Sequence, residues 1–249
     1  MITFPNAKIN LGLSILSKRE DGFHDIESCF YPIDLKDVLE INKSSQFSFH
    51  SHGLDIPGDS QSNLCIKAYQ LIHSDFNIPP VEINLLKKIP MGAGLGGGSA
   101  DGAFTLKMLN DLFELNMSSQ QLEEYALQLG SDCPFFIQNK PSIATGRGEI
   151  LSELELDLSS YRIEIINPNI HISTKEAYAG VSPNTPSTSI SKILSKPVSE
   201  WSNYLINDFE NSVFPNHPKI ENVKKEMYQR GAAYASMTGS GSTVFGIFK

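Results

Sequence analysis

Cysteine is scarce in this sequence of 249 residues, and its three cysteines form no recognisable pair. Cys29, Cys65 and Cys133 are odd in number and far apart, without a C-x-x-C motif, so we expect reduced thiols in a reducing compartment. Histidines are also few, and the single H-x-H motif, His50 and His52, has no third ligand at metal spacing. These absences favour a solvated loop over a metal site at residues 50–52.

Positive charge is in deficit as well. The 20 basic residues face 28 acidic ones, a net charge of −8, which disfavours a generic surface for nucleic acid or anionic membranes. Apolar runs of membrane-spanning length are missing, and the first residues lack the charged and apolar regions of a signal peptide. We therefore expect a cytoplasmic protein that binds neither nucleic acid nor membrane and meets any anionic substrate at a local site.

What the sequence does contain is a dense glycine run. Residues 89–101 read IPMGAGLGGGSAD, and five of these thirteen residues are glycine. An apolar/polar alternation over 81–85 predicts a strand before the run, and apolar residues at helical spacing from Ala100 predict a helix after it, with Ser99 or Asp101 as its cap. Because glycine amides and the positive end of a helix dipole converge there, the run predicts a phosphate site.

Two common phosphate loops do not match this run. The P-loop pattern fails because no lysine follows the glycines. Gly92, Gly94 and Gly97 meet the dinucleotide pattern G-x-G-x-x-G, but the acidic residue that should close a following strand would fall inside the predicted helix. A flexible linker is disfavoured because a strand and a helix flank the run.

Elsewhere, periodicity predicts a mixture of short strands and helices. At 249 residues with 40% hydrophobic content, the chain fits one large domain or two small ones. Helices are expected from Asn63, from Ser118 to Gly130 and around Val223. Strands are expected over 2–16, 38–41, 46–49, 162–166, 232–237 and 243–248.

The stretch from Pro90 to Ser99 closely resembles the ATP-phosphate loop of the GHMP kinases, the superfamily of galactokinase, homoserine, mevalonate and phosphomevalonate kinases. The resemblance implies the two-domain α+β GHMP kinase fold: a ribosomal protein S5 domain 2-like ATP-binding domain over 1–152 and a ferredoxin-like substrate-binding domain over 153–249. It also implies ATP as co-substrate together with Mg²⁺, which the Ser99 hydroxyl could reach. The residues that it assigns to ATP are Asn63, Leu64, Lys87, Pro90, Met91, Gly92, Ala93, Gly94, Leu95, Gly96, Gly97, Gly98, Ser99 and Ala100. A helix start and a solvated lysine explain Asn63, Leu64 and Lys87 nearly as well.

Two further segments resemble catalytic motifs of this family. Lys8 and Asn10 share one face of the first predicted strand, in a segment that looks like the first GHMP motif of one branch, where the lysine approaches the accepting hydroxyl and the transferred phosphate. Asp132 lies in G-S-D-C-P, which resembles the G-A-D-V-P segment whose aspartate is the proposed base. The alternatives are a solvated strand lysine and an aspartate that caps a turn.

Residues 19–24 read REDGFH, which resembles the R-x-D-G-Y-H cytidine-recognition motif of one GHMP branch. By this resemblance Phe23 stacks on a pyrimidine and His24 hydrogen-bonds its edge, with Phe23 in place of the usual tyrosine. Tyr178 would lie on the other side of the base, Thr174 near the catalytic aspartate, and Gly239 in a third glycine motif close to the phosphates and the substrate. A tight turn, a capped short helix and a glycine hairpin turn are the structural alternatives.

Together the resemblances imply an ATP-dependent kinase whose small-molecule substrate carries a cytidine diphosphate, acting as a monomer or weak homodimer. Asp132 would be its general base, assisted by Lys8. Two other hypotheses remain open at this point: a homoserine- or mevalonate-type GHMP kinase, and a non-catalytic nucleotide sensor. A dinucleotide oxidoreductase is the least favoured class.

Overall fold

The structure, a computed structural model, describes residues 1–249 apart from the side chain of Ser60. The chain folds into two compact units, each built from three separate stretches of the sequence. The first unit comprises Met1–Ala7, Asp34–Met91 and Gly96–Asn139, and the second comprises Lys8–Ile33, Gly92–Leu95 and Lys140–Lys249. The predicted domain boundary after residue 152 stays a prediction, because these units are defined by packing and not by sequence families.

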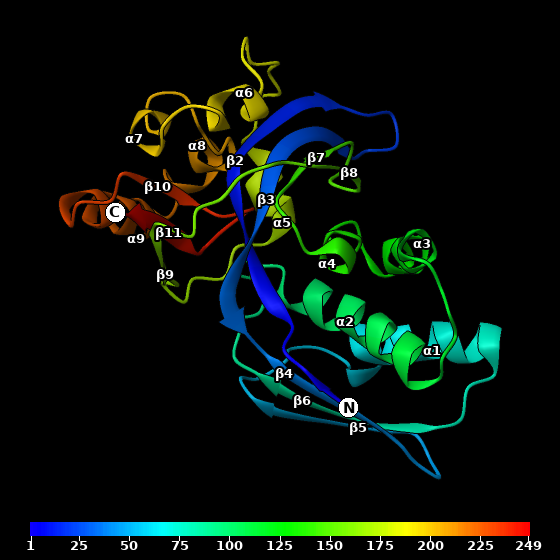
Figure 1. The fold of residues 1–249 in the computed structure, drawn as a ribbon. Helices are drawn as coiled ribbons and strands as arrows, with labels where there is room; N and C mark the ends of the chain where they lie inside the picture. Colours follow the sequence, from blue (N-terminus) through cyan, green and yellow to red (C-terminus); the bar gives the residue numbers. More distant parts are fainter. The chain divides into compact units, whose positions relative to one another are not determined.

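The first unit is a four-stranded sheet covered by helices (Figure 1). The strand order is β1-β4-β6-β5, in which β4 pairs antiparallel with β6 and β5 pairs parallel with it. Helices α1 and α2 pack together over the sheet, and α3 and α4 pack against α2. The bounds are β1 (Ile2–Thr3), β4 (Val38–Lys43), β5 (Ser48–Gly53), η1 (Ser60–Ser62), α1 (Leu64–Phe76), β6 (Val81–Lys87), α2 (Gly97–Leu112), α3 (Ser119–Leu129) and α4 (Phe135–Gln138).

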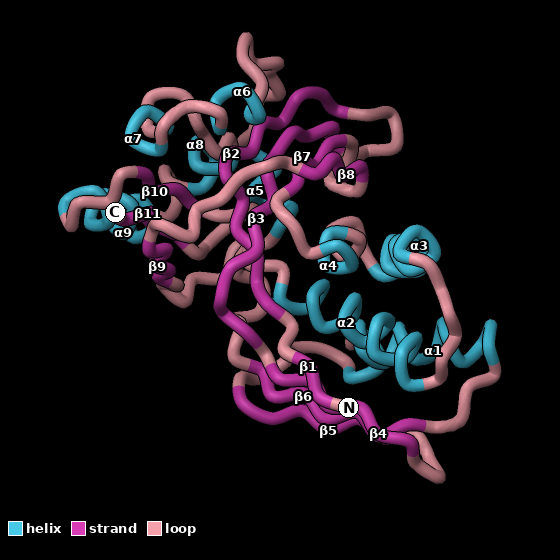
Figure 2. Tube along the Cα trace, viewed as in Figure 1, coloured by secondary structure: helices cyan, strands magenta, loops and turns pink.

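The second unit contains two small sheets and short helices (Figure 2). One sheet has the order β2-β3-β7-β8, and the other is antiparallel with the order β10-β11-β9. Helix α9 packs on β10 and β11 through Ile220 and Met227, which belong to the buried core of this unit. The bounds are β2 (Asn6–Lys18), β3 (His24–Lys36), β7 (Ser142–Thr145), β8 (Ile150–Glu153), β9 (Arg162–Ile166), α5 (Thr174–Ala179), α6 (Ile190–Leu194), α7 (Val198–Trp201), α8 (Phe209–Val213), α9 (Pro218–Gln229), β10 (Tyr234–Met237) and β11 (Val244–Phe248).

Several local predictions are confirmed because their determinants lie in the sequence itself. Asn63 caps α1 by accepting a hydrogen bond from the Cys65 amide, and Ser118 opens α3 with a complete capping box. The strand over 162–166 is observed as predicted, and the residues of β6 alternate between buried and partly exposed positions. The mixed α+β fold class is likewise as predicted.

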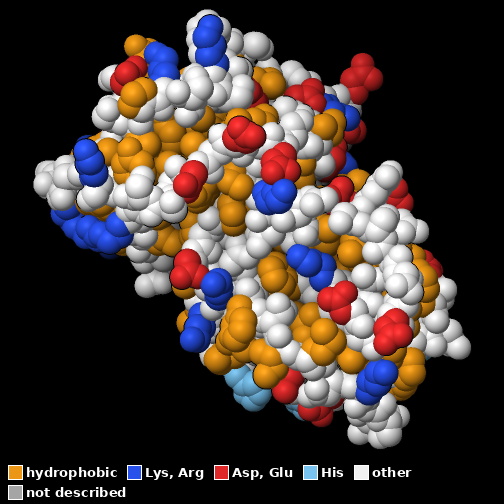
Figure 3. All heavy atoms as spheres, viewed as in Figure 1, with side chains coloured by type: hydrophobic (Ala, Val, Ile, Leu, Met, Phe, Trp, Pro, Cys, Tyr) orange, Lys and Arg blue, Asp and Glu red, His pale blue; other side chains and the backbone are white. Residues whose placement is uncertain are grey.

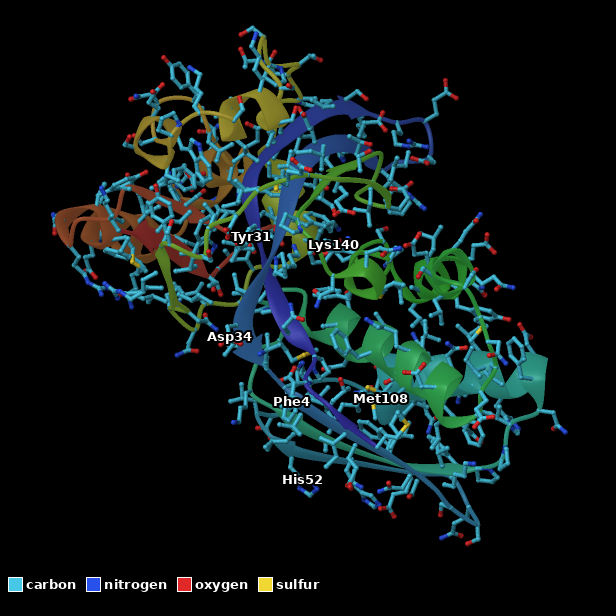
Figure 4. All side chains as sticks on the ribbon, in the orientation of Figure 1. Phe4, Tyr31, Asp34, His52, Met108 and Lys140 are labelled. Atoms are coloured by element: carbon cyan, nitrogen blue, oxygen red, sulfur yellow. The ribbon has the colours of Figure 1, made fainter. Side chains whose placement is uncertain are left out.

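Other predictions are wrong at the level of single residues. The cap of α2 is Gly96, so Ser99 and Asp101 lie inside the helix and do not cap it. The strand predicted at 46–49 begins at Ser48 and continues to Gly53, because its parallel pairing with β6 sets its register. His50 and His52 therefore lie on an exposed edge strand and not in a loop; Figure 4 labels His52 there.

On the face drawn in Figure 3, basic and acidic side chains lie among apolar and neutral ones. Across the described side chains, we find no group of three or more His, Cys, Asp or Glu residues that could hold a metal ion. Within the same residues, none of the helices is long and apolar enough to cross a membrane.

Candidate active site

The glycine run forms the passage between a strand and a helix. Gly92, Gly94 and Gly96 all have positive φ angles, which glycine adopts at little cost. The first hydrogen bond of α2 joins the Ala100 amide to the Gly96 carbonyl, so the amides of residues 97–99 precede the helical ladder. The backbone therefore offers donors at the positive end of a 16-residue helix, as a phosphate site requires.

Lys87 lies behind this helix start, in the first unit. Its side chain is completely buried, and its ammonium contacts Asp37 Oδ2 at 2.5 Å and Asp101 Oδ2 at 2.6 Å. Burial disfavours the charged form of Lys87, but the two carboxylates outweigh this effect and raise its pKa. The alternative of a solvated lysine is thus wrong, and the ammonium that the resemblance assigns to ATP is engaged by two carboxylates.

Asp37 and Asp101 extend this cluster to both ends of the glycine run. Asp37 Oδ1 accepts hydrogen bonds from the amides of Lys88 and Ile89, which lead into the run. A Cβ added to Gly97 would lie 2.7 Å from Ile89 Cγ2 and 3.0 Å from Lys87 Nζ, so the helix start packs directly on the cluster. Burial, with the neighbouring Asp37 charge, raises the pKa of Asp101 to about 8, although Lys87 opposes this shift.

Lys8 and Asn10 are buried in the second unit. Lys8 is 4% exposed, and its ammonium donates to Asn10 Oδ1 at 2.6 Å and lies 4.7 Å from the centre of the Phe30 ring. The backbone amide of Lys8 donates to the carbonyl of Leu95, within the glycine run. The alternative of a solvated lysine is wrong here too, and the strand carries Lys8 beside the glycine run.

The turn around Gly239 meets the same part of the glycine run. A Cβ on Gly94 would lie 2.0 Å from the Thr238 carbonyl oxygen, and a Cβ on Gly239 would lie 3.2 Å from Gly94 Cα. Asn207 holds the turn from behind, because its Nδ2 donates to the carbonyls of Met237 and Gly239. The structure thus brings Gly94 and Gly239 into contact, two residues that the sequence analysis assigned to one site.

The residues predicted to bind cytosine also gather in the second unit. The rings of His24 and Tyr178 are stacked, with centroids 4.6 Å apart and planes 18° apart. Phe23 is 54% exposed, and the guanidinium of Arg147 lies 5.0 Å from its ring centre. Thr174 is the first residue of α5 and is exposed, and Ser173 rather than Thr174 caps this helix.

Asp132 occupies a half-buried position in the turn before α4. The side chain of the neighbouring Cys133 lies near that of Ser99, so this turn lies at the first turn of α2 in the first unit. The structure therefore places Asp132 close to the helix start that ends the glycine run. A second prediction for the same unit, that Asn63 and Leu64 open a helix, is confirmed, while their contact with ATP stays a prediction.

Four buried polar residues contact the predicted site residues, although the sequence analysis did not assign them to the site. They are Ser28, Asp37, Asp101 and Thr238. Their local sequence gives no clear signal, because Ser28 follows Glu27 and Asp37 follows Lys36. Their partners lie up to 228 residues away along the chain.

Comparison with known families identifies both halves of the chain. Residues 63–140 match the family described as GHMP kinases N terminal domain, and residues 193–249 match GHMP kinases C terminal.

Individual relatives agree with this match along the whole chain. A 4-diphosphocytidyl-2-C-methyl-D-erythritol kinase of Bacteroides fragilis is 54% identical over 252 residues, which cover 100% of this chain and 92% of that protein. A kinase of the same name from Cytophaga hutchinsonii is also 54% identical, with the same coverage of both chains. A crystal structure of a 4-(cytidine 5'-diphospho)-2C-methyl-D-erythritol kinase superposes with a TM-score of 0.85 at 31% identity, covering 99% of this chain and 90% of that one.

Proposed function

The chain belongs to the GHMP kinases and is an ATP-dependent small-molecule kinase, and we propose that its acceptor is the 2-hydroxyl of 4-diphosphocytidyl-2-C-methyl-D-erythritol. The products are ADP and the 2-phosphate, and the reaction is a step of the non-mevalonate route to isoprenoid precursors. Relatives of this name that are 54% identical over the whole chain support this substrate. The geometric observation that carries the proposal is the buried Lys8 ammonium, on a residue whose amide bonds to the glycine run.

Phosphate binding is proposed for the glycine run. Backbone amides of residues 92–99 would hold the ATP phosphates, where the helix dipole of α2 stabilises negative charge. Mg²⁺ would be held largely by the phosphates themselves, as is usual for this ion, and the Ser99 hydroxyl is an oxygen ligand of the kind that it accepts.

Cytosine recognition is proposed for the aromatic group in the second unit. Phe23 offers an exposed ring for stacking, and Arg147 on one side of that ring would continue the stack through a cation–aromatic contact. His24 would hydrogen-bond the polar edge of the base, and Tyr178, already stacked on His24, would contact it from the other side. Because Phe23 has no phenol, its contribution is stacking alone.

For the transfer itself, Asp132 would accept the proton of the 2-hydroxyl as that oxygen attacks the γ-phosphorus, and ADP would leave. Lys8 would stabilise the negative charge that develops on the transferred phosphoryl group and on the attacking oxygen. Asn10 Oδ1, at 2.6 Å, holds the ammonium in place. Both side chains act in the transition state, so losing either should lower kcat far more than it raises KM.

The test measures ADP release from purified protein with ATP and Mg²⁺. Four acceptors are compared: the cytidine compound, mevalonate, homoserine and galactose. Turnover with the cytidine compound alone is the expected result. Turnover with another alcohol would overturn the acceptor assignment, and ATP binding without turnover of any of the four would favour a nucleotide sensor.

Variants then separate the two halves of the proposal. Lys8→Ala and Asp132→Asn should lower kcat, whereas Phe23→Ala and His24→Ala should mainly raise the KM for the cytidine compound. Stacking contributes about 1–3 kcal/mol per base, so the KM change for Phe23→Ala should be about 5- to 150-fold. Wild-type turnover in any of these variants would remove the role proposed for that residue.

A further inference from the structure

A buried network of neutral side chains surrounds Asn10. Asn10, Ser28 and Thr238 are each at most 2% exposed, and the contacts that join them lie within the second unit. Lys8 and Asn10 are successive residues on one face of β2, and Ser28 and Phe30 are successive residues on one face of the neighbouring β3. The pairs face each other in order, because Lys8 lies over Phe30 while Asn10 bonds to Ser28.

The orientation of the Asn10 amide is determined from both of its ends. The Ser28 hydroxyl donates its only proton to the Gly12 carbonyl at 2.6 Å, so it can only accept from Asn10 Nδ2, at 2.8 Å. At the other end the Lys8 ammonium can only donate, so it requires the amide oxygen, at 2.6 Å. Reversing the amide would place two donors together at Lys8 and two acceptors together at Ser28.

Thr238 connects this network to the glycine run. Its hydroxyl accepts from the Asn10 backbone amide at 3.0 Å and lies within donating distance of the Gly94 carbonyl, at 3.0 Å, and of Asn10 Oδ1, at 3.3 Å. One hydroxyl therefore holds the strand of Lys8 and Asn10 against Gly94. The Gly94 backbone is packed so closely on Thr238 that small shifts of either would be transmitted to the other.

We propose that Ser28 and Thr238 are positioning residues for phosphoryl transfer. Ser28 sets the orientation of the Asn10 amide and, through its oxygen, the location of the Lys8 ammonium. Thr238 holds the strand that carries this ammonium at a fixed position against Gly94 in the glycine run. The inference rests on the proposed role of Lys8, and neither residue needs to contact substrate, because misplacing a reacting group by about 1 Å can cost about 100-fold in rate.

The test uses substitutions that remove one hydroxyl each. Ser28→Ala and Thr238→Val should lower kcat by about 10- to 100-fold while the KM for ATP changes by less than about threefold. Thr238→Ser retains the hydroxyl and should recover most of the kcat lost in Thr238→Val. The matched control is Ser142→Ala, which removes another buried hydroxyl of the same sheet, one that donates to the Lys140 carbonyl, and it should leave kcat unchanged.

A double variant distinguishes positioning from a general loss of structure. If Ser28 acts through Lys8, adding Ser28→Ala to Lys8→Met should cost no further activity, whereas independent effects would multiply. Unfolding curves of each variant establish that the protein measured is folded. Wild-type kcat in Ser28→Ala, or multiplied effects in the double variant, would overturn the inference while leaving Lys8 in place. Wild-type kcat in Lys8→Met would instead overturn the proposed function.

Discussion

Lys87 and Lys8 are both almost fully buried, yet the two units hold their ammonium groups with different kinds of partner. In the first unit Lys87 lies between the carboxyl groups of two acidic residues, Asp37 and Asp101. In the second unit Lys8 donates to a neutral amide oxygen and lies over an aromatic ring. Pairing with acidic groups offsets the cost of burying the Lys87 ammonium. The location of the Lys8 ammonium depends instead on whether the oxygen or the nitrogen of the Asn10 side-chain amide faces it.

The difference shows what each arrangement can be used for. The Lys87 cluster joins the strand before the glycine run to the helix after it, so its main effect should be on stability and on the shape of the run. The Lys8 network places one donor beside the glycine run, so its main effect should be on the rate of transfer. The predictions below test this division, from the largest expected effect to the smallest.

Replacing Lys87 should cause the largest loss of stability. Lys87→Met leaves Asp37 and Asp101 buried without their cation, and breaking a buried ion pair in this way costs about 3–5 kcal/mol. Denaturant unfolding measures the change in the free energy of unfolding. The control Lys225→Met removes an exposed ion pair with Glu221 and should cost at most about 1 kcal/mol. Equal losses in the free energy of unfolding of the two variants would show that the buried cluster stabilises the fold no more than an exposed ion pair does.

Replacing Lys8 should affect the rate more than the stability. Lys8→Met removes the donor that we propose for the transferred group, and losses of this type lower kcat by about 100- to 1,000-fold. Its free energy of unfolding should fall by less than that of Lys87→Met, because the hydrogen bond it loses is to a neutral amide. Steady-state kinetics and unfolding are measured on the same preparation, with Lys18→Met at the exposed end of β2 as control. A larger stability loss than in Lys87→Met would reverse the comparison.

The pH dependence of the free energy of unfolding should reveal the raised pKa of Asp101. Burial raises the pKa of this carboxyl from about 4 in the unfolded chain to about 8, so the folded protein binds an extra proton between these values. The free energy of unfolding should therefore fall as pH rises through this window, by at most about 1.4 kcal/mol per pH unit.

Asp101→Asn does not titrate and should lack this decline. Its free energy of unfolding minus that of the wild type should increase between pH 5 and pH 8. Denaturant unfolding at three pH values in that range measures the difference, and a constant difference would place the pKa of Asp101 elsewhere.

The smallest expected signal is the labelling of the three cysteine thiols in the native protein. Burial raises the pKa of Cys29 and of Cys133 to about 12 and raises that of Cys65 further, and all three side chains are buried and unpaired. A neutral thiol reacts slowly, so a disulfide reagent at pH 7 should label the native protein far more slowly than the unfolded one. Absorbance of the released thiolate follows both reactions. Rapid labelling of the native protein would mean that local opening exposes a thiol.

Sequence reasoning recovered those parts of the fold and site whose determinants are local. The capping box at Ser118, the strand before the glycine run and the shared face of Lys8 and Asn10 follow from spacing along a few residues. It failed where distant pairing decides the outcome. The register of β5 depends on β6, and Asp101 turns inward because Lys87 and Asp37 meet it from other segments.

The sequence alone indicated the family, the glycine run with its flanking strand and helix, and the residue types of the proposed site, because glycine content, capping residues and motif order depend on short stretches of chain. Only the tertiary structure decided which buried polar group faces which. Lys8 and Asn10 acquire their orientation from Ser28 and Thr238, and Lys87 acquires its carboxylates from Asp37 and Asp101. The physical reason is that a buried donor or acceptor must be satisfied in three dimensions, by whichever segment packing brings within about 3 Å.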